Sequence, residues 1–293
     1  MTNIKVTVFS PTYNRAYILP QLYQSLKNQT CKDFEWLIVD DGSADDTESI
    51  VSLWTADNNG FPIRYIKKEN GGKCRAINYG VEFAEGELFF NVDSDDYLTS
   101  DAIEKIINWE ANLPKDKKYC GITGNLGYTE TSTPNHIFDG EFVDATLLER
   151  YTGIDGERAY VFYTEIQKKY KYPEFDGEKF ITEASAWNRI ANDGYLMRFY
   201  NDIICIYEYR DDGLTKAGNS IFVNNPHGYG LWLKEKDIFM NKSFSDKLKT
   251  YYSFTCELQN KYDDKLIAEC IDIPVVLVKI LKAIHKIISL IRK

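Results

Sequence analysis

Three carboxylates stand within four residues of this chain, directly after an apolar run. The stretch LFFNVDSDDYL, residues 88–98, passes through Val92 and then meets Asp93, Asp95 and Asp96. Like charges this close repel one another and disfavour ionisation. A divalent cation offsets the repulsion, because Mg²⁺ and Mn²⁺ prefer oxygen ligands and often keep bonds to substrate phosphates. The cluster predicts metal-assisted phosphate chemistry, and a turn that caps the next helix is the alternative.

The elements that must position this cluster alternate regularly over the first hundred residues. Strand patterns end in polar or glycine-containing turns, and each is followed by apolar residues at helical spacing. Strands are expected within residues 4–10, 34–43, 62–70 and 87–96, and helices within residues 17–29, 45–56, 71–84 and 100–112. This order predicts an α/β fold with a mostly parallel sheet and helices on both of its faces.

The second half of the chain is less regular. After about Pro114 we expect a strand at 118–126, loops and short strands over 127–180, a helix at 178–191 and a strand at 203–211. From about Lys234 the pattern is helical again. No internal repeat and no low-complexity linker divides the chain.

Polar groups follow every one of the first four predicted strands. Thr12 and Arg15 follow the first, Asp40 and Asp41 end the second, Lys73 follows the third, and the acid cluster follows the fourth. In an open α/β sheet, ligands bind beyond the carboxyl ends of the strands. Exposed loops are polar in any protein, but four coincidences on one edge favour a binding site.

Four motifs in this order carry a resemblance to a known family. They are FSPTYNR, LIVDDGSADDT, ENGGKCRAINYG and NVDSDD. Their order and spacing resemble the N-terminal half of the family 2 glycosyltransferases with the GT-A fold, closely over residues 4–110 and more loosely to about 215. The resemblance implies a Rossmann-like sheet flanked by helices, with a helical C-terminal extension.

Domain boundaries follow from the same resemblance. It implies a GT-A domain over residues 1–215, with a nucleotide-binding half at 1–113 and an acceptor-binding half at 114–215. Residues 216–293 would form the helical extension, which ends in a basic amphipathic helix at 274–293.

The resemblance also implies contacts to a nucleotide. Thr12 and Asp41 would hydrogen-bond the base, Pro11 would pack near it, and Arg15 would reach a phosphate. Lys73 stands where the family often has a group near the donor, and a solvated lysine at a helix start is the alternative.

The acidic pair matches the family's D-x-D motif. Asp93 would contact the ribose and metal-bound water, and Asp95 would bind Mn²⁺ or Mg²⁺ directly. For Asp96, the resemblance implies either a cap of the following helix or a contact to sugar.

A catalytic base is implied within FITEASAWNRI. Glu183 stands six residues before Arg189, where the family's acidic base is found, although Thr182 replaces the acid that usually precedes it. Trp187, one helical turn after Glu183, is a candidate sugar-stacking wall, and a core position is the alternative. His227 is a candidate metal contact, with an exposed loop histidine as the alternative.

The implied activity is metal-dependent, inverting transfer of a sugar from a nucleotide-diphosphate sugar, with UDP as the expected nucleotide. A catalytically inactive relative that binds nucleotide or carbohydrate is the alternative. Phosphatases of the haloacid dehalogenase type and receiver domains also use paired acids, but theirs follow the first strand. Here the pair follows the fourth predicted strand, which argues against both.

Composition limits the class of partner. The 293 residues carry a formal net charge of −9, which argues against a protein that coats nucleic acid. The six cysteines are scattered without a C-x-x-C pair, and MTNIKVTVFSPTYNR lacks the apolar stretch of a signal peptide. A cytoplasmic enzyme is the expectation.

The C-terminal stretch IPVVLVKILKAIHKIISLIRK differs from the rest of the chain. Its polar residues recur at steps of three or four: Lys279, Lys282, Lys286, Ser289 and Lys293, flanked by His285 and Arg292. Lysines interrupt the stretch too often for a transmembrane span. A basic stripe beside aliphatic residues favours a helix on the inner face of the cell membrane, which fits a lipid-linked glycan acceptor. Packing on the protein itself or on a partner subunit is the alternative.

Overall fold

The computed structural model describes residues 4–154, 156–208, 210, 213, 216 and 218–291. The chain divides into two compact units. The N-terminal unit comprises Met1–Lys171 and Arg189–Arg210, and the C-terminal unit comprises Tyr172–Asn188 and Asp211–Lys293. The domain boundary expected after residue 215 remains a prediction. In the structure, residues 172–188 belong to the same compact unit as the C-terminal helices.

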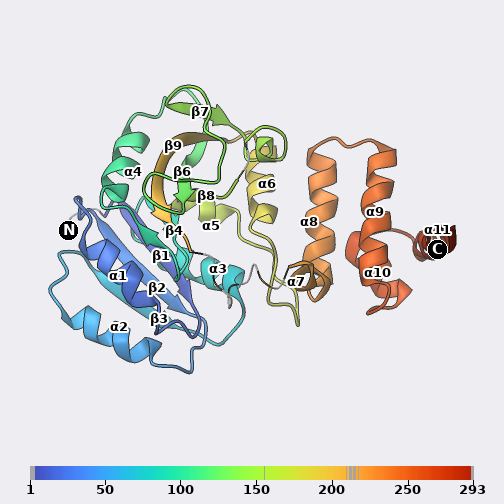
Figure 1. Cartoon of the computed structure of the whole chain (residues 1–293), viewed down its shortest axis with the longest axis horizontal. Coiled ribbons are helices and arrows are strands. Elements are labelled where there is room, and N and C mark those ends of the chain that lie inside the picture. Colours follow the sequence, from blue (N-terminus) through green and yellow to red (C-terminus); the bar gives the residue numbers. More distant parts are fainter. Residues whose placement is uncertain are drawn as a thin grey trace. The chain divides into compact units, whose positions relative to one another are not determined.

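A mixed sheet forms the centre of the N-terminal unit (Figure 1). Its described strands are β1 (Val6–Thr12), β2 (Phe34–Asp40), β3 (Ile63–Lys67), β4 (Leu88–Asn91), β5 (Tyr97–Leu98), β6 (Tyr119–Gly127), β7 (Phe142–Ala145), β8 (Arg158–Tyr163) and β9 (Leu196–Ile206). Their order is β3-β2-β1-β4-β8-β6-β9-β5, and β7 pairs with β9. Strands β1 to β4 are parallel, whereas β8 runs antiparallel to β4 and β6. The predicted, mostly parallel α/β sheet is confirmed.

Helices cover both faces of this sheet. They are α1 (Leu19–Lys27), α2 (Thr47–Ala56), α3 (Lys73–Phe83), α4 (Ala102–Ala111) and α5 (Thr164–Lys169). On one face, Val6 and Val8 pack in a core that residues of α1, α2 and α4 also enter. Phe9, on the other face, lies against α3 so closely that a Cβ on Gly80 would come within 2.0 Å of its ring. Alternate side chains of β1 therefore pack against helices on opposite faces of the sheet.

Two boundaries differ from the sequence-based expectation in this unit. Strand β1 continues through Pro11, which was expected to end it, and Pro11 pairs with Val39 of β2. Strand β9 begins at Leu196, before the expected residue 203, because its first residues pair in parallel with β6. That pairing joins segments far apart in the chain.

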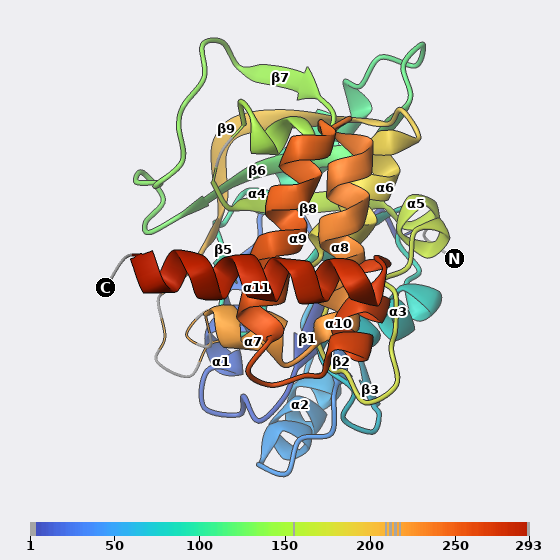
Figure 2. The ribbon, with the colours of Figure 1, turned by 90° about the vertical axis from the view of Figure 1, so that its right-hand side faces the viewer.

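Helices form most of the C-terminal unit. They are α7 (Asn219–Val223), α8 (Pro226–Phe239), α9 (Phe244–Leu258), α10 (Asp264–Ile271) and α11 (Val275–Ile291), after α6 (Ala184–Asn192), which spans the division between the units. Their shared core includes Phe254, Leu258, Ile267 and Val278. Figure 2 shows α11 lying across α9 and α10. Within the described residues, we find no helix with the length and apolar character needed to cross a bilayer.

The expected helical start near Lys234 was too late. Helix α8 begins at Pro226, and the segment PHGYG, which resembles a loop in composition, is its first turn. Proline is favoured at this position, because its missing N–H would have no intrahelical partner there.

A partly buried ion pair between Asp144 and Arg198 joins β7 to β9. Arg198 donates from Nε and Nη2 to the Asp144 carboxylate at 2.7 and 3.0 Å. Burial alone would raise the pKa of Asp144, but the hydrogen bonds from Arg198, Tyr119 and Lys117 outweigh it and hold the pKa at about 2.

We expect Asp144→Asn to lower the free energy of unfolding by about 2 kcal/mol at pH 7, measured by urea denaturation. Because the folded pKa of Asp144 lies below its usual value of 3.8, its contribution is present above about pH 4 and is lost as the pH falls towards 2. The difference in the free energy of unfolding between Asp144→Asn and the wild type should therefore shrink as the pH falls from about 4 towards 2. The exposed Asp116→Asn is the control, and equal stability of both variants at pH 7 would contradict the interpretation.

Candidate active site

Parallel pairing brings the predicted nucleotide residues and the acid loop to one edge of the sheet. Thr12 pairs with Asp40, and the backbone N–H of Val92 donates to the carbonyl of Phe9 at 2.8 Å. Thr12 is 2% exposed, and its buried Oγ1 has no hydrogen-bond partner among the described residues. A buried hydroxyl without a partner at a strand end is available to a ligand.

The Asp41 carboxylate holds the loop that follows β3. It accepts hydrogen bonds from Lys68 Nζ at 2.7 Å and from the backbone N–H groups of Gly71 and Gly72 at 2.9 and 2.7 Å. Asn70 Nδ2 donates to it at 3.1 Å. Asp41 therefore fixes the start of α3, and its contact to a base remains a prediction. The sequence analysis missed Lys68 and Asn70, although both stand in the polar run KKENGG at a strand end.

Asp40 stabilises the neighbouring turn. Its carboxylate accepts hydrogen bonds from the backbone N–H of Ser43 at 2.7 Å and from the Tyr65 hydroxyl. Gly42 in this turn has φ +88°, a conformation that side chains with a Cβ rarely adopt. The DDGS sequence thus forms a fixed turn beside Thr12 and Asp41.

Two predicted nucleotide-binding cations, Arg15 and Lys73, lie beside the predicted acids. Lys73 Nζ donates to Asp93 Oδ2 at 2.8 Å, and Arg15 Nη2 lies 4.0 Å from Asp95 Oδ2. Lys73 is the first residue of α3, whereas Arg15 lies between β1 and α1. Residues from three loops therefore meet at the carboxyl end of β4.

Burial and crowding disfavour ionisation of the carboxyl groups in the acid loop. Burial and the nearby Asp93 raise the pKa of Asp95, and Arg15 opposes this shift. Burial, Asp93 and Asp95 raise the pKa of Asp96 well above its usual range. The two cations do not compensate all three carboxyls.

The loop fits a divalent cation that also binds phosphate. Mg²⁺ in such sites takes one or two protein carboxylates and completes its coordination with phosphate and water oxygens. Asp95, the predicted metal ligand, would provide such a carboxylate, with Asp93 beside it. Across the described ranges, no group of three or more His, Cys, Asp or Glu side chains forms a metal-binding cluster.

Asp96 is separated from the next helix. The two-residue strand β5 follows it directly and pairs with β9, and α4 begins only at Ala102 after Asp101. Asp96 therefore does not cap α4, and of its two expected roles the sugar contact is the one that remains.

Glu183 and Trp187 belong to the C-terminal unit. The Glu183 carbonyl accepts hydrogen bonds from the backbone N–H groups of Ala186 and Trp187 at 3.2 and 3.3 Å, so Glu183 immediately precedes α6. The predicted helix at 178–191 was thus too long at its N-terminal end. The base and sugar-stacking roles remain predictions.

His227 lies in the first turn of α8, and Glu178 caps that turn. Glu178 accepts hydrogen bonds from the backbone N–H groups of His227 and Gly228 at 2.8 and 3.0 Å, and it lies 2.8 Å from His227 Nδ1. A carboxylate is favoured at a helix N-terminus, where the helix dipole is positive. His227 is therefore held in place instead of being a loose loop residue.

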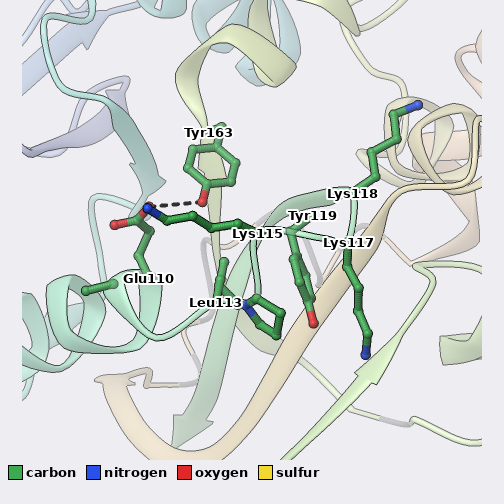
Figure 3. Close-up of a pocket in the computed structure, with 9 residues that line it drawn as sticks. Glu110, Leu113, Lys115, Lys117, Lys118, Tyr119 and Tyr163 are labelled. Carbon is green, nitrogen blue, oxygen red and sulfur yellow. Dashed lines mark hydrogen bonds between the residues drawn. The ribbon is translucent and has the colours of Figure 1, made fainter.

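A pocket of about 540 Å³ lies at the opposite ends of the strands from the acid loop (Figure 3). Tyr119 at the start of β6 and Tyr163 at the end of the antiparallel β8 line it, with the Tyr163 hydroxyl donating to Glu110 at 3.0 Å. Because these are the amino ends of the parallel strands, this pocket is separate from the acid loop.

Comparison with known proteins identifies the family. Residues 7–180 match the family described as Glycosyl transferase family 2. The chain belongs to this family. It is 38% identical over 269 residues to a chondroitin synthase of Pasteurella multocida, covering 85% of this chain and 24% of that protein. It is 27% identical over 256 residues to a GalNAc(5)-diNAcBac-PP-undecaprenol beta-1,3-glucosyltransferase of Campylobacter jejuni, covering 84% and 78%.

The matched length differs between these relatives. A hyaluronan synthase of Pasteurella multocida is 27% identical, with 88% of this chain and 24% of that protein covered. The chain therefore spans about a quarter of the length of the two Pasteurella synthases.

Solved structures show the same GT-A fold. S. aureus TarS 1–349 in complex with UDP-GlcNAc matches with a TM-score of 0.61 at 15% identity, covering 96% of this chain and 91% of that one. A mannosyltransferase from Pyrobaculum calidifontis in complex with GDP-Man and Mn²⁺ matches with a TM-score of 0.58 at 17% identity, covering 98% and 80%. The predicted family and fold are confirmed.

We expect Asp41→Ala to lower the free energy of unfolding by about 3 kcal/mol, because it leaves Lys68 and two backbone N–H groups without their acceptor. Urea denaturation measures this loss. Asp116→Ala, at an exposed position outside the helices and strands, serves as the control and should change the unfolding free energy by less than about 0.5 kcal/mol. Similar values for the two variants would show that Asp41 does not hold the loop.

Proposed function

We propose that this chain is a metal-dependent inverting glycosyltransferase that moves a sugar from a nucleotide-diphosphate sugar to a hydroxyl of a glycan or lipid-linked glycan. One observation carries the proposal: the acid loop of Asp93 and Asp95 lies beside Arg15 and Lys73 at the carboxyl edge of the sheet, in a member of this family. Carboxylates that suit a cation and basic side chains that suit phosphate therefore lie together at this end of the strands.

The nucleotide binds across the ends of β1 and β2 in this proposal. Thr12 Oγ1, buried and without a described partner, hydrogen-bonds the base, and Pro11 packs near it. Asp41 joins this contact while holding the loop before α3. UDP is the nucleotide we favour, supported by the UDP-GlcNAc complex of the similar TarS structure.

The acid loop holds the diphosphate through a cation, Mn²⁺ or Mg²⁺. When bound, the cation neutralises charge that develops on the departing diphosphate. Asp95 would hold the cation, Asp93 would contact the ribose and water on the cation, and Arg15 and Lys73 would bind phosphate oxygens.

Glu183 acts as the general base. It removes the proton of an acceptor hydroxyl as that oxygen forms a bond to the anomeric carbon. The bond from this carbon to the diphosphate oxygen breaks, and the nucleoside diphosphate leaves with the bonding electrons. Attack opposite the leaving group inverts the configuration. Trp187 forms a wall for a sugar ring, and Asp96 contacts a sugar hydroxyl.

Helix α11 supports a membrane-bound acceptor. Its exposed side chains form a largely apolar row: Val276, Ile280, Ile284, Ile287 and Leu290. Lys279 and Lys286 are exposed beside this row, whereas the whole chain has a net charge of −9. Such a surface fits the interface of an anionic bilayer, and we propose that it holds the enzyme on the inner face of the cell membrane. The undecaprenol-linked glycan in the name of the Campylobacter relative supports a lipid-linked acceptor.

The expected lysine stripe is divided in the structure. Lys282 forms an ion pair with Asp264 of α10, and His285 Nδ1 lies 3.0 Å from the Tyr252 hydroxyl of α9. These two residues face the protein together with the buried Val278 and Leu281, so packing occupies one side of α11. Arg292 and Lys293 lie outside the described residues.

We expect Asp95→Asn and Glu183→Gln to affect different steps. Asp95→Asn should abolish the Mn²⁺-dependent gain in UDP affinity and reduce transfer about 10²-fold or more. Glu183→Gln should bind UDP as the wild type does and reduce transfer at least about 10²-fold. Calorimetry and nucleotide-release assays separate the two effects.

The exposed Glu165→Gln and Asp46→Asn are matched controls for this pair. Full transfer by Glu183→Gln would show that the base is a different group. Binding of nucleotide sugars by wild type without any turnover would instead favour the inactive relative.

We expect the double variant Ile280→Ser, Ile287→Ser to bind vesicles that contain anionic phospholipid about tenfold more weakly than the wild type. Each substitution removes apolar side-chain area that would be buried in the membrane interface. Vesicle co-sedimentation measures the change. Leu53→Ser, which alters a similarly exposed residue of α2, should bind as the wild type does. Unchanged binding of the double variant, or of protein lacking residues 272–293, would contradict the membrane role.

A further inference from the structure

Two tyrosines that the sequence analysis did not single out lie together beyond β6 and β9. Tyr128 follows the last residue of β6, and Tyr207 follows the last residue of β9. The backbone N–H of Tyr207 donates to the carbonyl of Gly127 at 3.0 Å. The two ring centroids are 5.2 Å apart with an angle of 41° between the planes. Tyr128 is 54% exposed, so the pair presents an aromatic surface.

This tyrosine pair lies beside the acid loop. Strand β5 runs antiparallel to β9 with Tyr97 opposite Ile206, so one step further in the same register sets Asp96 opposite Tyr207. Electrostatic contact agrees with this position: burial, the Tyr128 hydroxyl, Glu157 and Asp96 all raise the pKa of Tyr207. The phenol of Tyr207 therefore stays neutral at physiological pH.

A buried polar network holds the pair in position. Asn125 of β6 accepts a hydrogen bond from Arg158 at 2.7 Å and donates one to the carbonyl of Asn201 at 2.7 Å. The backbone N–H of Tyr128 donates to the carbonyl of Ser132 at 2.8 Å, which closes the turn after β6. An aromatic surface with a fixed backbone loses little conformational entropy when a ligand packs on it.

The strand order indicates which part of the nucleotide-sugar donor the tyrosine pair would contact. In the proposed function the base lies at the ends of β1 and β2 and the diphosphate lies at the loop after β4. Strands β6 and β9 follow β4 in the sheet order, with β8 between β4 and β6. Because β8 is antiparallel to both β4 and β6, and β9 is parallel to β6, the strands β4, β6 and β9 all run in the same direction. The sugar is attached to the diphosphate, so the next surface in this direction is the tyrosine pair.

We propose that Tyr128 and Tyr207 form the surface on which the donor's sugar ring packs, with its hydroxyls directed towards Asp96. This inference rests on the proposed function. The C–H groups on one face of a pyranose carry partial positive charge, which suits the negative face of an aromatic ring. The pair thus selects for the presence of a sugar on the nucleotide, whereas the base and phosphates bind elsewhere.

The test compares the binding of UDP with that of UDP-hexoses. Isothermal titration in the presence of Mn²⁺ measures affinities of wild type and Tyr128→Ala for UDP, UDP-Glc, UDP-Gal, UDP-GlcNAc and UDP-GalNAc. We expect Tyr128→Ala to weaken binding of the preferred UDP-hexose by about three- to tenfold and to leave UDP affinity unchanged. Tyr128→Phe, which keeps the ring, should bind as the wild type does.

The matched control is Tyr79→Ala. Tyr79 is also exposed and forms a tilted pair with Phe83, at 5.0 Å between centroids, on α3. This variant should leave both affinities unchanged. Near-ultraviolet circular dichroism and thermal unfolding verify that each variant is folded.

Each contrary outcome has a distinct meaning. Failure of wild type to bind any nucleotide sugar would overturn the proposed function and this inference with it. Wild-type binding of the UDP-hexose together with unchanged affinity in Tyr128→Ala would overturn this inference alone. Equal weakening of UDP and UDP-hexose, or an effect confined to the KM for the acceptor, would also show that the pair does not bind the donor sugar.

Discussion

The repulsion among Asp93, Asp95 and Asp96 is the constraint around which the candidate site is arranged. A buried strand carries these acids to the sheet edge, where burial and mutual repulsion raise the pKa of Asp95 and Asp96. Lys73 and Arg15 arrive from two other loops and neutralise part of the charge. In the proposed function, a divalent cation and the diphosphate that it binds would relieve the remaining repulsion between the carboxyl groups.

The rest of the N-terminal unit keeps those loops in place. Parallel pairing of β1, β2 and β4 fixes three strand ends at one edge, and Asp41 fixes the start of α3 and thus Lys73. On the far side of β4, the pairing of β5 with β9 brings the tyrosine pair to Asp96. In the proposed function, these strand ends carry the contacts to the base, the diphosphate and the sugar, in that order along the sheet.

Local patterns were enough to predict the first four strands and helices, because each strand is apolar and ends in a polar or glycine turn. They also brought Thr12, Arg15, Lys73 and the acid loop to one edge. They did not reveal the Asp41 network, half of whose donors are the backbone N–H groups of Gly71 and Gly72, or the first turn of α8, whose composition resembles a loop. Tyr128 and Tyr207 meet only through pairing of distant strands, for which a local pattern carries no signal.

The central claim is that the acid loop binds the diphosphate through a divalent cation, and the linkage between Mn²⁺ and UDP tests it most directly. Isothermal titration of wild-type protein with UDP, with and without saturating Mn²⁺, measures that coupling. The account predicts that Mn²⁺ raises UDP affinity at least about tenfold, a coupling of about 1.4 kcal/mol. Equal UDP affinity with and without Mn²⁺ would contradict it.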